Sequence, residues 1–428
     1  MYFRVAFGLL SLVAMLRLLF SHWLNDFLLK PQYTFKHAFF DFLSVPNPWV
    51  LYSIAILTCL STVLIIFGYV YRLSMVVFFL GFSAIHLMDI TNYLNHYYLL
   101  SLIALIMIFL PLDRKKIAVV PIYQWHYLIL RFQLAMLYFY AGVAKINTDW
   151  LFYAQPLKIW LKARTSTPLI GWLFEYDFIP YVMSWSGCLY DLTIVFWLSW
   201  PITRRYAYVL VIVFHMMTHL LFQIGMFPWI MIFLTPIFFD PHRFDRSWLF
   251  LDRLPKWQGL LIDQKSSPKP IATKPIKSLI YGLIFVYVLF QICLPLRTFW
   301  YGGNVLWHEQ GMRFSWRVMI REKNGHLIYH ISSARHPEQK WEINPKDYLT
   351  WRQVIEMSSQ PDMIADFAKF LSKIAKEKGI SDPIIQVDSM VSLNGRKPQR
   401  MIDPNVDLLH LPSDFNQWIL PAPTDQPR

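Results

Sequence analysis

Long apolar runs, separated by short polar loops, fill the first 297 residues of the chain. A transmembrane helix needs about 20 predominantly apolar residues. Runs close to that length cover residues 5–28, 49–70, 73–90, 97–112, 126–145, 183–201, 206–223, 226–239 and 277–297. The pattern predicts a polytopic all-α membrane bundle of about nine transmembrane helices over residues 1–297, in which the eighth helix is partial or broken.

The pattern changes after Arg297. Residues 314–334 alternate like a strand on both sides of "KNGH", which predicts a β-hairpin that turns at this tetrapeptide. Residues 362–379 have helical periodicity, late lysines and a terminal glycine. Residues 384–396 return to strand character and end in a second Asn-Gly turn. We therefore predict that residues 298–428 form a soluble, strand-rich α+β domain.

The basic residues predict the orientation in the membrane, because short cytoplasmic loops carry an excess of lysine and arginine. Basic loops at 112–120, 201–205 and 241–277 all fall on one side of the predicted bundle. This places the N-terminus in the cytoplasm and the domain 298–428 outside it. The first apolar segment lacks a small-residue cleavage site, so we expect a retained span rather than a signal peptide.

Composition supports a membrane protein and argues against a nucleic-acid partner. The chain is 56% hydrophobic and 16% charged, with a mean hydropathy of +0.36. Its net charge of +13 comes from loops between apolar runs, unlike a nucleic-acid groove. The three cysteines lie inside apolar segments and form no CxxC pair, so we expect small buried side chains rather than disulfides or metal ligands.

One lysine stands where the fifth apolar run ends, in "AGVAKINTDW" (141–150). Lys145 could anchor the helix by extending its amine to the membrane surface. It could instead form a helical ion pair with Asp149, four residues later. A third possibility is a desolvated amine, whose lowered pKa would make it a usable base.

Other polar groups interrupt the apolar pattern. His96 follows Asn95 at the predicted outer end of the third and fourth spans, on the same side as Lys145. His215, His219 and Gln223 follow one another at intervals of four residues, so they form a polar stripe on one helix. This stripe could make interhelical hydrogen bonds, line a ligand cavity, or bind haem or a metal, although no Glu or Cys completes a zinc set nearby.

Several motifs together resemble the vitamin K-dependent gamma-glutamyl carboxylases, which belong to a wider membrane group named for a horizontally transferred transmembrane domain. In the first part these are "NHYYL" (95–99), "FQLAMLYFYAGVAKINTDW" (132–150) and "QIGMF" (223–227). "FSWRVMI" (314–320), "INP" (343–345) and "MIDPNVDLL" (401–409) follow in the family's order. The resemblance thus covers nearly the whole chain.

The resemblance implies a specific chemistry. In the family, a lysine amine deprotonates reduced vitamin K, and oxygenation generates a base strong enough to remove a γ-proton from a peptide glutamate. The carbanion captures CO2, giving γ-carboxyglutamate and vitamin K epoxide. Lys145 matches the catalytic lysine, His96 a histidine that assists, and His215 a further functional histidine. The implied cofactor is phylloquinone or menaquinone hydroquinone, with O2 and CO2 as co-substrates and no metal.

The resemblance also implies a cavity that opens outward, so that the quinol enters from lipid and a glutamate-containing protein or peptide from outside. Such a cavity would keep the carbanion from water. We expect Asn95, His215, His219 and Gln223 to contribute to cofactor binding. Three aromatic residues of the soluble domain are expected to contact peptide or quinone, unless they serve packing alone: Trp307, Phe314 and Trp316.

The chain departs from the family at its C-terminus, where the vertebrate enzymes are considerably longer. This suggests a bacterial homologue with a periplasmic domain; in a eukaryote that domain would lie in the lumen of the endoplasmic reticulum. Alternatives are a quinol epoxidase without a peptide substrate, a non-catalytic membrane binding or transport protein of the same fold, and a haem protein.

Overall fold

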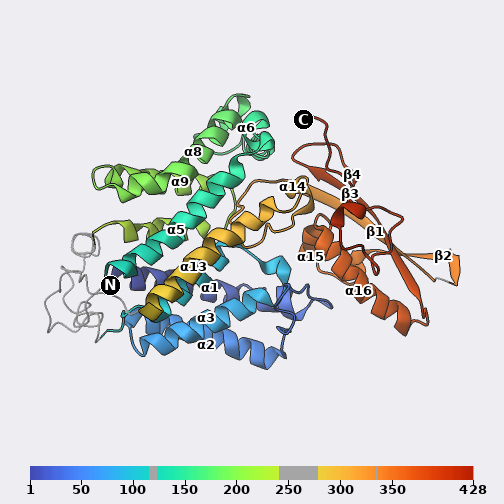
Figure 1. The fold of residues 1–428 in the computed structure, drawn as a ribbon, viewed down its shortest axis with the longest axis horizontal. Helices are drawn as coiled ribbons and strands as arrows, with labels where there is room; N and C mark the ends of the chain where they lie inside the picture. The colour runs from blue at the N-terminus through green and yellow to red at the C-terminus, as the bar shows by residue number, and fades with distance from the viewer. Residues whose placement is uncertain (115–122, 241–277, 334, 428) are drawn as a thin grey trace.

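The computed structural model describes residues 1–114, 123–240, 278–333 and 335–427. Figure 1 shows a helical N-terminal part, which the long helices α5 and α13 cross, and a smaller part of strands and helices that contains the C-terminus. We refer to residues 298–427 as the C-terminal domain.

Each predicted apolar segment contains a helix. The main helices of the N-terminal part are α1 (Tyr2–Phe20), α2 (Pro48–Phe67), α3 (Tyr71–Leu87), α4 (Asn95–Phe109), α5 (Gln124–Lys145), α8 (Ile179–Ser199), α9 (Arg204–Leu221), α10 (Phe227–Leu234) and α13 (Ser278–Leu296). Short helices lie between them: η1 (Asn25–Leu29), η2 (Ile90–Asn92), α6 (Thr148–Tyr153), α7 (Leu157–Lys162), η3 (Gly171–Glu175) and η4 (Thr235–Phe238).

Local chemistry explains where α2 begins and ends. Asn47 precedes α2, and its side chain accepts a hydrogen bond from the Val50 amide, while Pro48 occupies the first turn. Gly68 ends this helix in the left-handed region, with φ of 73°. Neighbouring helices then pack in sequence, α1 on α2, α2 on α3 and α3 on α4, while α5 packs on α8.

Among the described residues, four helices are long and apolar enough to cross a membrane. They are α1, α2, α5 and the continuous helical segment Ser278–Phe299. Three shorter apolar helices are α3, α4 and the segment Phe227–Phe238. The mostly helical, membrane-type character of the N-terminal part is thereby confirmed, and the number of about nine spans stays a prediction. The predicted orientation also stays a prediction, because residues 115–120 and 241–277 of its basic loops lie outside the described residues.

The cysteines are free, but they do not all behave as expected. Cys59 and Cys188 are buried, whereas Cys293 is exposed on α13. The prediction of a buried side chain is therefore wrong for Cys293. Its helix packs through a narrow face that contains Gln291 and Pro295, so most of its apolar side chains point outward.

The C-terminal domain contains an antiparallel four-stranded sheet in the order β2-β1-β3-β4. Its strands are β1 (Lys323–Ser333), β2 (His336–Ile343), β3 (Pro383–Leu393) and β4 (Gln399–Arg400). Its helices are η6 (Arg297–Phe299), α14 (Val305–His308), η7 (Pro345–Asp347), α15 (Trp351–Met357), α16 (Pro361–Glu377) and η8 (Phe415–Gln417).

Helix α16 packs against β3, which gives the domain a buried core between helix and sheet. The helix predicted at 362–379 is therefore confirmed, as is the strand followed by an Asn-Gly turn, where Asn394 and Gly395 have φ of 49° and 81°.

The predicted hairpin at "KNGH" is wrong. Strand β1 runs straight through these four residues, and Asn324 and Gly325 pair with Ser392 and Val391 of β3. The glycine is required there for another reason. A Cβ at Gly325 would lie 2.1 Å from the carbonyl oxygen of Ser358, so the strand can approach this backbone only without a side chain.

Candidate functional site

Lys145 is the last residue of α5, yet its side chain is buried, and the residue is 6% exposed. Its amine donates hydrogen bonds to Asp191 Oδ2 at 2.7 Å and to the Ala141 carbonyl at 3.2 Å. It also lies 5.3 Å from the ring centroid of Trp150. The amine is therefore held inside the protein, and the alternative of a surface anchor is wrong.

Asp149 is not the partner of Lys145. Its carboxylate accepts hydrogen bonds from both terminal nitrogens of Arg396, at 2.6 and 2.8 Å, and from the Asn394 amide group at 2.8 Å. The helical ion pair fails because α5 ends at Lys145, and Asn147 caps a new helix, α6. An i,i+4 pair needs one uninterrupted helix.

Asp191, the carboxylate that does meet Lys145, lies in the middle of α8 and is buried. Sequence reasoning missed this residue. A signal was available, because Asp191 is the one acidic residue in the apolar segment 179–199, and ionisable groups in such segments carry a functional hypothesis. The pairing itself depends on the packing of α5 against α8.

Lys145 and Asp191 both face a cavity of about 520 Å³. Helices α5, α8 and α9 supply most of its wall, and Val318 and Met319 of the C-terminal domain complete it. Its lining is rich in aromatic rings: Tyr138, Trp150, Trp160, Tyr190, Trp197, Phe214, Phe222 and Phe227. The cavity is therefore apolar, with an ion pair in its wall, and both parts of the chain build it.

His215 lines the same cavity and is buried. Its Nε2 lies 3.0 Å from the Tyr138 hydroxyl, and its Nδ1 has no hydrogen-bond partner within the part of the chain that the structure describes. A buried polar atom without a partner is costly, and Nδ1 has almost no surface open to the cavity, so the ring is held there by the packing around it and by the Tyr138 contact.

His219 and Gln223 face elsewhere. They line a separate groove of about 790 Å³, which they share with Arg17 and Trp229. His219 is exposed and meets Trp229 edge-on, with ring centroids 5.3 Å apart. The structure thus divides the polar stripe of α9 between two cavities, and the two histidine rings do not converge on a common ligand.

His96 and Asn95 lie in the first turn of α4. His96 is buried, and its ring lies 6.1 Å from that of Phe227, which lines the cavity of Lys145. Asn95 instead connects the two parts of the chain, because it accepts from the Tyr93 hydroxyl at 3.0 Å and donates to the Arg317 carbonyl at 3.3 Å.

Comparison with known families covers both parts of the chain. Residues 1–242 match the HTTM domain, and residues 276–425 match the vitamin K-dependent gamma-carboxylase, lumenal domain. The chain belongs to the vitamin K-dependent gamma-glutamyl carboxylase family. No solved structure matches it.

Membership in the carboxylase family indicates a membrane protein with a lumenal C-terminal domain and a carboxylase-like function. It implies a vitamin K cofactor and glutamate-containing substrate proteins. Among the described residues, no group of three or more His, Cys, Asp or Glu side chains is placed to hold a metal ion.

Packing contacts are what the structure shows for the three aromatic residues that were predicted to contact peptide or quinone, Trp307, Phe314 and Trp316. Trp307 is buried and donates to the Leu420 carbonyl at 2.8 Å. Trp316 is fully buried and stacks on Tyr98, with centroids 4.8 Å apart. Phe314 packs edge-on against Tyr98 at 5.0 Å. Phe314 and Trp316 thus connect the loop 314–320 to α4.

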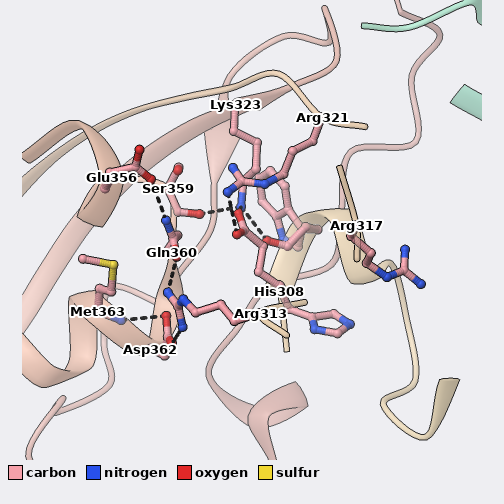
Figure 2. Close-up of polar contacts among 12 residues, drawn as sticks. His308, Arg313, Arg317, Arg321, Lys323, Glu356, Ser359, Gln360, Asp362 and Met363 are labelled. Atoms are coloured by element: carbon pink, nitrogen blue, oxygen red, sulfur yellow. Dashed lines mark hydrogen bonds and ion pairs between the residues drawn. The ribbon is translucent and has the colours of Figure 1, made fainter. Parts of the chain in front are cut away.

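A third, polar pocket of about 310 Å³ lies in the C-terminal domain, and residues of the segment 314–334, predicted as a hairpin, form part of its lining (Figure 2). The fully buried amine of Lys323 donates to Glu309 at 2.8 Å, and Arg321 contacts the same carboxylate at 2.8 Å. Burial lowers the pKa of the Lys323 amine to about 8, although the charge of Glu309 opposes this shift. The amine is therefore mostly protonated near neutral pH.

Proposed function

We propose that this protein carries out vitamin K-dependent γ-carboxylation of peptidyl glutamate, coupled to epoxidation of reduced vitamin K, with O2 and CO2 as co-substrates. The observation that carries the proposal is the buried amine of Lys145 in an apolar cavity formed by both parts of a carboxylase-family chain.

The cavity suits a hydrophobic quinol. Its aromatic lining offers flat apolar surfaces for the ring, and His215 adds a polar side chain to the same wall. When bound, reduced vitamin K together with O2 would supply the strong base that removes the γ-proton of glutamate. In this proposal Lys145 acts from the cavity wall, whereas His96 does not line the cavity and contacts its lining residue Phe227, with ring centroids 6.1 Å apart.

Lys145 can accept a proton only as a neutral amine. Asp191 provides the means, because its carboxylate lies 2.7 Å from the amine and can take up the ammonium proton. That transfer would leave a neutral amine beside a neutral carboxylic acid, so that neither group would keep an unpaired charge in the apolar cavity. The amine is then free to accept a proton from a ligand hydroxyl.

The surrounding residues keep water away from this chemistry. Trp150 lies beside the amine, and Val318 and Met319 form the wall contributed by the C-terminal domain. A carbanion formed next to this wall would be protected from protonation by water until it meets CO2. The C-terminal domain would also present the glutamate of the substrate peptide to the cavity.

One assay tests the proposal. Membranes containing the protein are supplied with vitamin K hydroquinone, a glutamate-containing peptide and labelled bicarbonate, and both labelled peptide and epoxide are measured. We expect both products. Epoxide without labelled peptide would instead identify a quinol epoxidase, and the absence of both products would contradict either enzymatic function.

Lys145→Ala tests the role of the amine in the same assay. We expect loss of both products, by about 100-fold or more, because a positioned base typically contributes that much. A small exogenous amine that enters the cavity should restore part of the activity. Epoxidation at the wild-type rate in Lys145→Ala would show that another group is the base.

A further inference from the structure

Arg317 differs from the other cations around the polar pocket. Arg321 and Lys323 share the Glu309 carboxylate, and Arg313 pairs with Asp362 (Figure 2). Arg317 lines the pocket, is half-buried, and donates to the Thr298 hydroxyl at 3.1 Å. It has no carboxylate partner among the residues that the structure describes. Figure 2 shows its guanidinium pointing away from Arg321 and Lys323.

The remaining carboxylates of the pocket are committed to other donors. Glu322 accepts from the Trp160 indole at 2.6 Å, and Glu356 accepts from the Gln360 amide at 3.0 Å. Arginine stays protonated in proteins, and a partly buried guanidinium without an anion loses hydration that no charge compensates. The Arg317 side chain therefore favours the binding of an anion beside it.

The polar pocket adjoins the cavity of Lys145. Met319 lines both, so a single side chain forms part of the wall between them. Arg317 and Met319 belong to a loop in which Phe314, Trp316 and Met319 have positive φ values of 62°, 57° and 52°. Non-glycine residues adopt this conformation rarely, and such strain gathers at binding sites. The loop places Met319 between the two cavities and Arg317 in the wall of the polar pocket.

We propose that Arg317 binds the γ-carboxylate of the substrate glutamate in the polar pocket, with the glutamate methylenes directed past Met319 toward the cavity of Lys145. This inference rests on the proposed function and assigns its peptide site. A guanidinium matches a carboxylate with two parallel hydrogen bonds. It would also stabilise the negative charge that spreads onto this carboxylate when the γ-carbon loses its proton.

Peptide binding tests the assignment without any quinol, so that its failure can be told apart from failure of the carboxylation reaction. A short fluorescent peptide with one glutamate and its glutamine counterpart are titrated with the purified full-length protein in detergent, and anisotropy gives both Kd values. We expect the glutamate peptide to bind about tenfold or more tightly than the glutamine peptide, as for a charge-assisted hydrogen bond.

Arg317→Gln should remove this preference, weakening the glutamate peptide about tenfold or more while leaving the glutamine peptide unchanged. Arg317→Lys, which keeps the charge but not the fork of donors, should weaken it severalfold and serves if the first variant does not fold. Arg400→Gln is the matched control, because this exposed arginine pairs with Asp388 on the sheet. It should bind both peptides like the wild type.

The outcomes that overturn the proposal are equally definite. Equal affinity of the wild type for both peptides, or unchanged glutamate selectivity in Arg317→Gln, would exclude Arg317 as the carboxylate site. Binding of labelled bicarbonate that Arg317→Gln abolishes, without glutamate selectivity in the wild type, would assign the pocket to bicarbonate instead. Selective peptide binding without carboxylation would sustain this site and contradict only the proposed function.

Discussion

Lys145 and Asp191 form a buried ion pair whose partners lie 46 residues apart in the chain. Lys145 could be singled out from the sequence, because an apolar run ends at a charged residue. Its partner could not be predicted, because the pairing depends on how α5 packs against α8. The local spacing predicted Asp149 as the partner instead, but Asp149 lies beyond the end of α5 and does not meet the Lys145 amine. The i,i+4 rule requires one continuous helix, and here α5 ends at Lys145 and α6 begins at Thr148.

The pair predicts that Asp191→Asn impairs catalysis without removing the base. Asparagine keeps the size of the side chain, but it neither fixes an ammonium as firmly nor accepts its proton. We expect both products to fall about 100-fold, the magnitude typical of a misplaced catalytic group. The measurement is kcat for epoxide and labelled peptide, with the KM for the quinol expected to change little.

A double variant separates this positioning role from a loss of folding. If Asp191 acts through Lys145, adding Asp191→Asn to Lys145→Ala should cost no further activity, because the two residues act as one unit. Asp388→Asn, an isosteric change at a half-exposed position of β3, controls for the substitution itself. Additive losses in the double variant would show that Asp191 has a separate, structural role.

At the scale of elements, two Asn-Gly pairs in the C-terminal domain show what local sequence can predict. Asn394-Gly395 forms the expected turn after β3, with both residues at positive φ. Asn324-Gly325 lies within β1, and this strand pairs with β3 over its whole length. The two dipeptides are identical, so the difference comes from tertiary contacts: Asn324 and Gly325 pair with β3, and Gly325 lies against the Ser358 backbone. Helix α16 was predictable because its apolar face repeats over many turns.

Gly325→Ala should therefore destabilise the C-terminal domain through overpacking and not through a turn. The added Cβ would lie 2.1 Å from the Ser358 oxygen, and the backbone must shift to admit it. We expect a loss of about 1–3 kcal/mol, the usual cost of an extra carbon in a packed site. The measurement is the thermal unfolding midpoint of the full-length protein in detergent.

Gly282→Ala provides the control for this prediction. Gly282 lies in α13, and a Cβ there would meet nothing within 4 Å. Alanine favours a helix more than glycine does, so the midpoint should stay the same or rise slightly. If Gly325→Ala unfolds at the wild-type temperature, the close approach of β1 to Ser358 does not constrain this strand.

At the scale of the whole molecule, the cavity of Lys145 lies between parts of the chain that are far apart in sequence. The order of motifs predicted two parts, a helical membrane part and a mixed C-terminal domain, because each has its own hydrophobic period. It could not predict that Val318 and Met319 complete a wall begun by α5, α8 and α9. Domain docking depends on particular side chains, and periodicity does not specify them.

One contact between the two parts of the chain involves Asp149, four residues after Lys145. Asp149 accepts two hydrogen bonds from Arg396 and one from Asn394, and the side chains of Asp149 and Arg396 are only 7% and 10% exposed. This charged contact joins the start of α6 to the turn after β3. It therefore connects the segment that carries the base to the domain expected to present the peptide.

Asp149→Asn should loosen this docking, because it leaves the Arg396 guanidinium buried without its carboxylate. Breaking a buried ion pair typically costs about 3–5 kcal/mol locally. We expect faster proteolysis of the segment between α13 and β1. Labelled peptide should fall about tenfold, and epoxide less, since the cavity helices that hold the base remain packed. Limited proteolysis and the ratio of the two products measure these effects.

Arg396→Lys should behave similarly, because a lysine cannot reproduce the two parallel hydrogen bonds. Arg400→Gln, which alters an exposed pair of the same domain, should change neither proteolysis nor product ratio. If Asp149→Asn abolishes epoxidation as completely as Lys145→Ala, the carboxylate acts on the base itself. If neither variant alters proteolysis, docking rests on the packing of the loop 314–320 against α4, where Trp316 stacks on Tyr98.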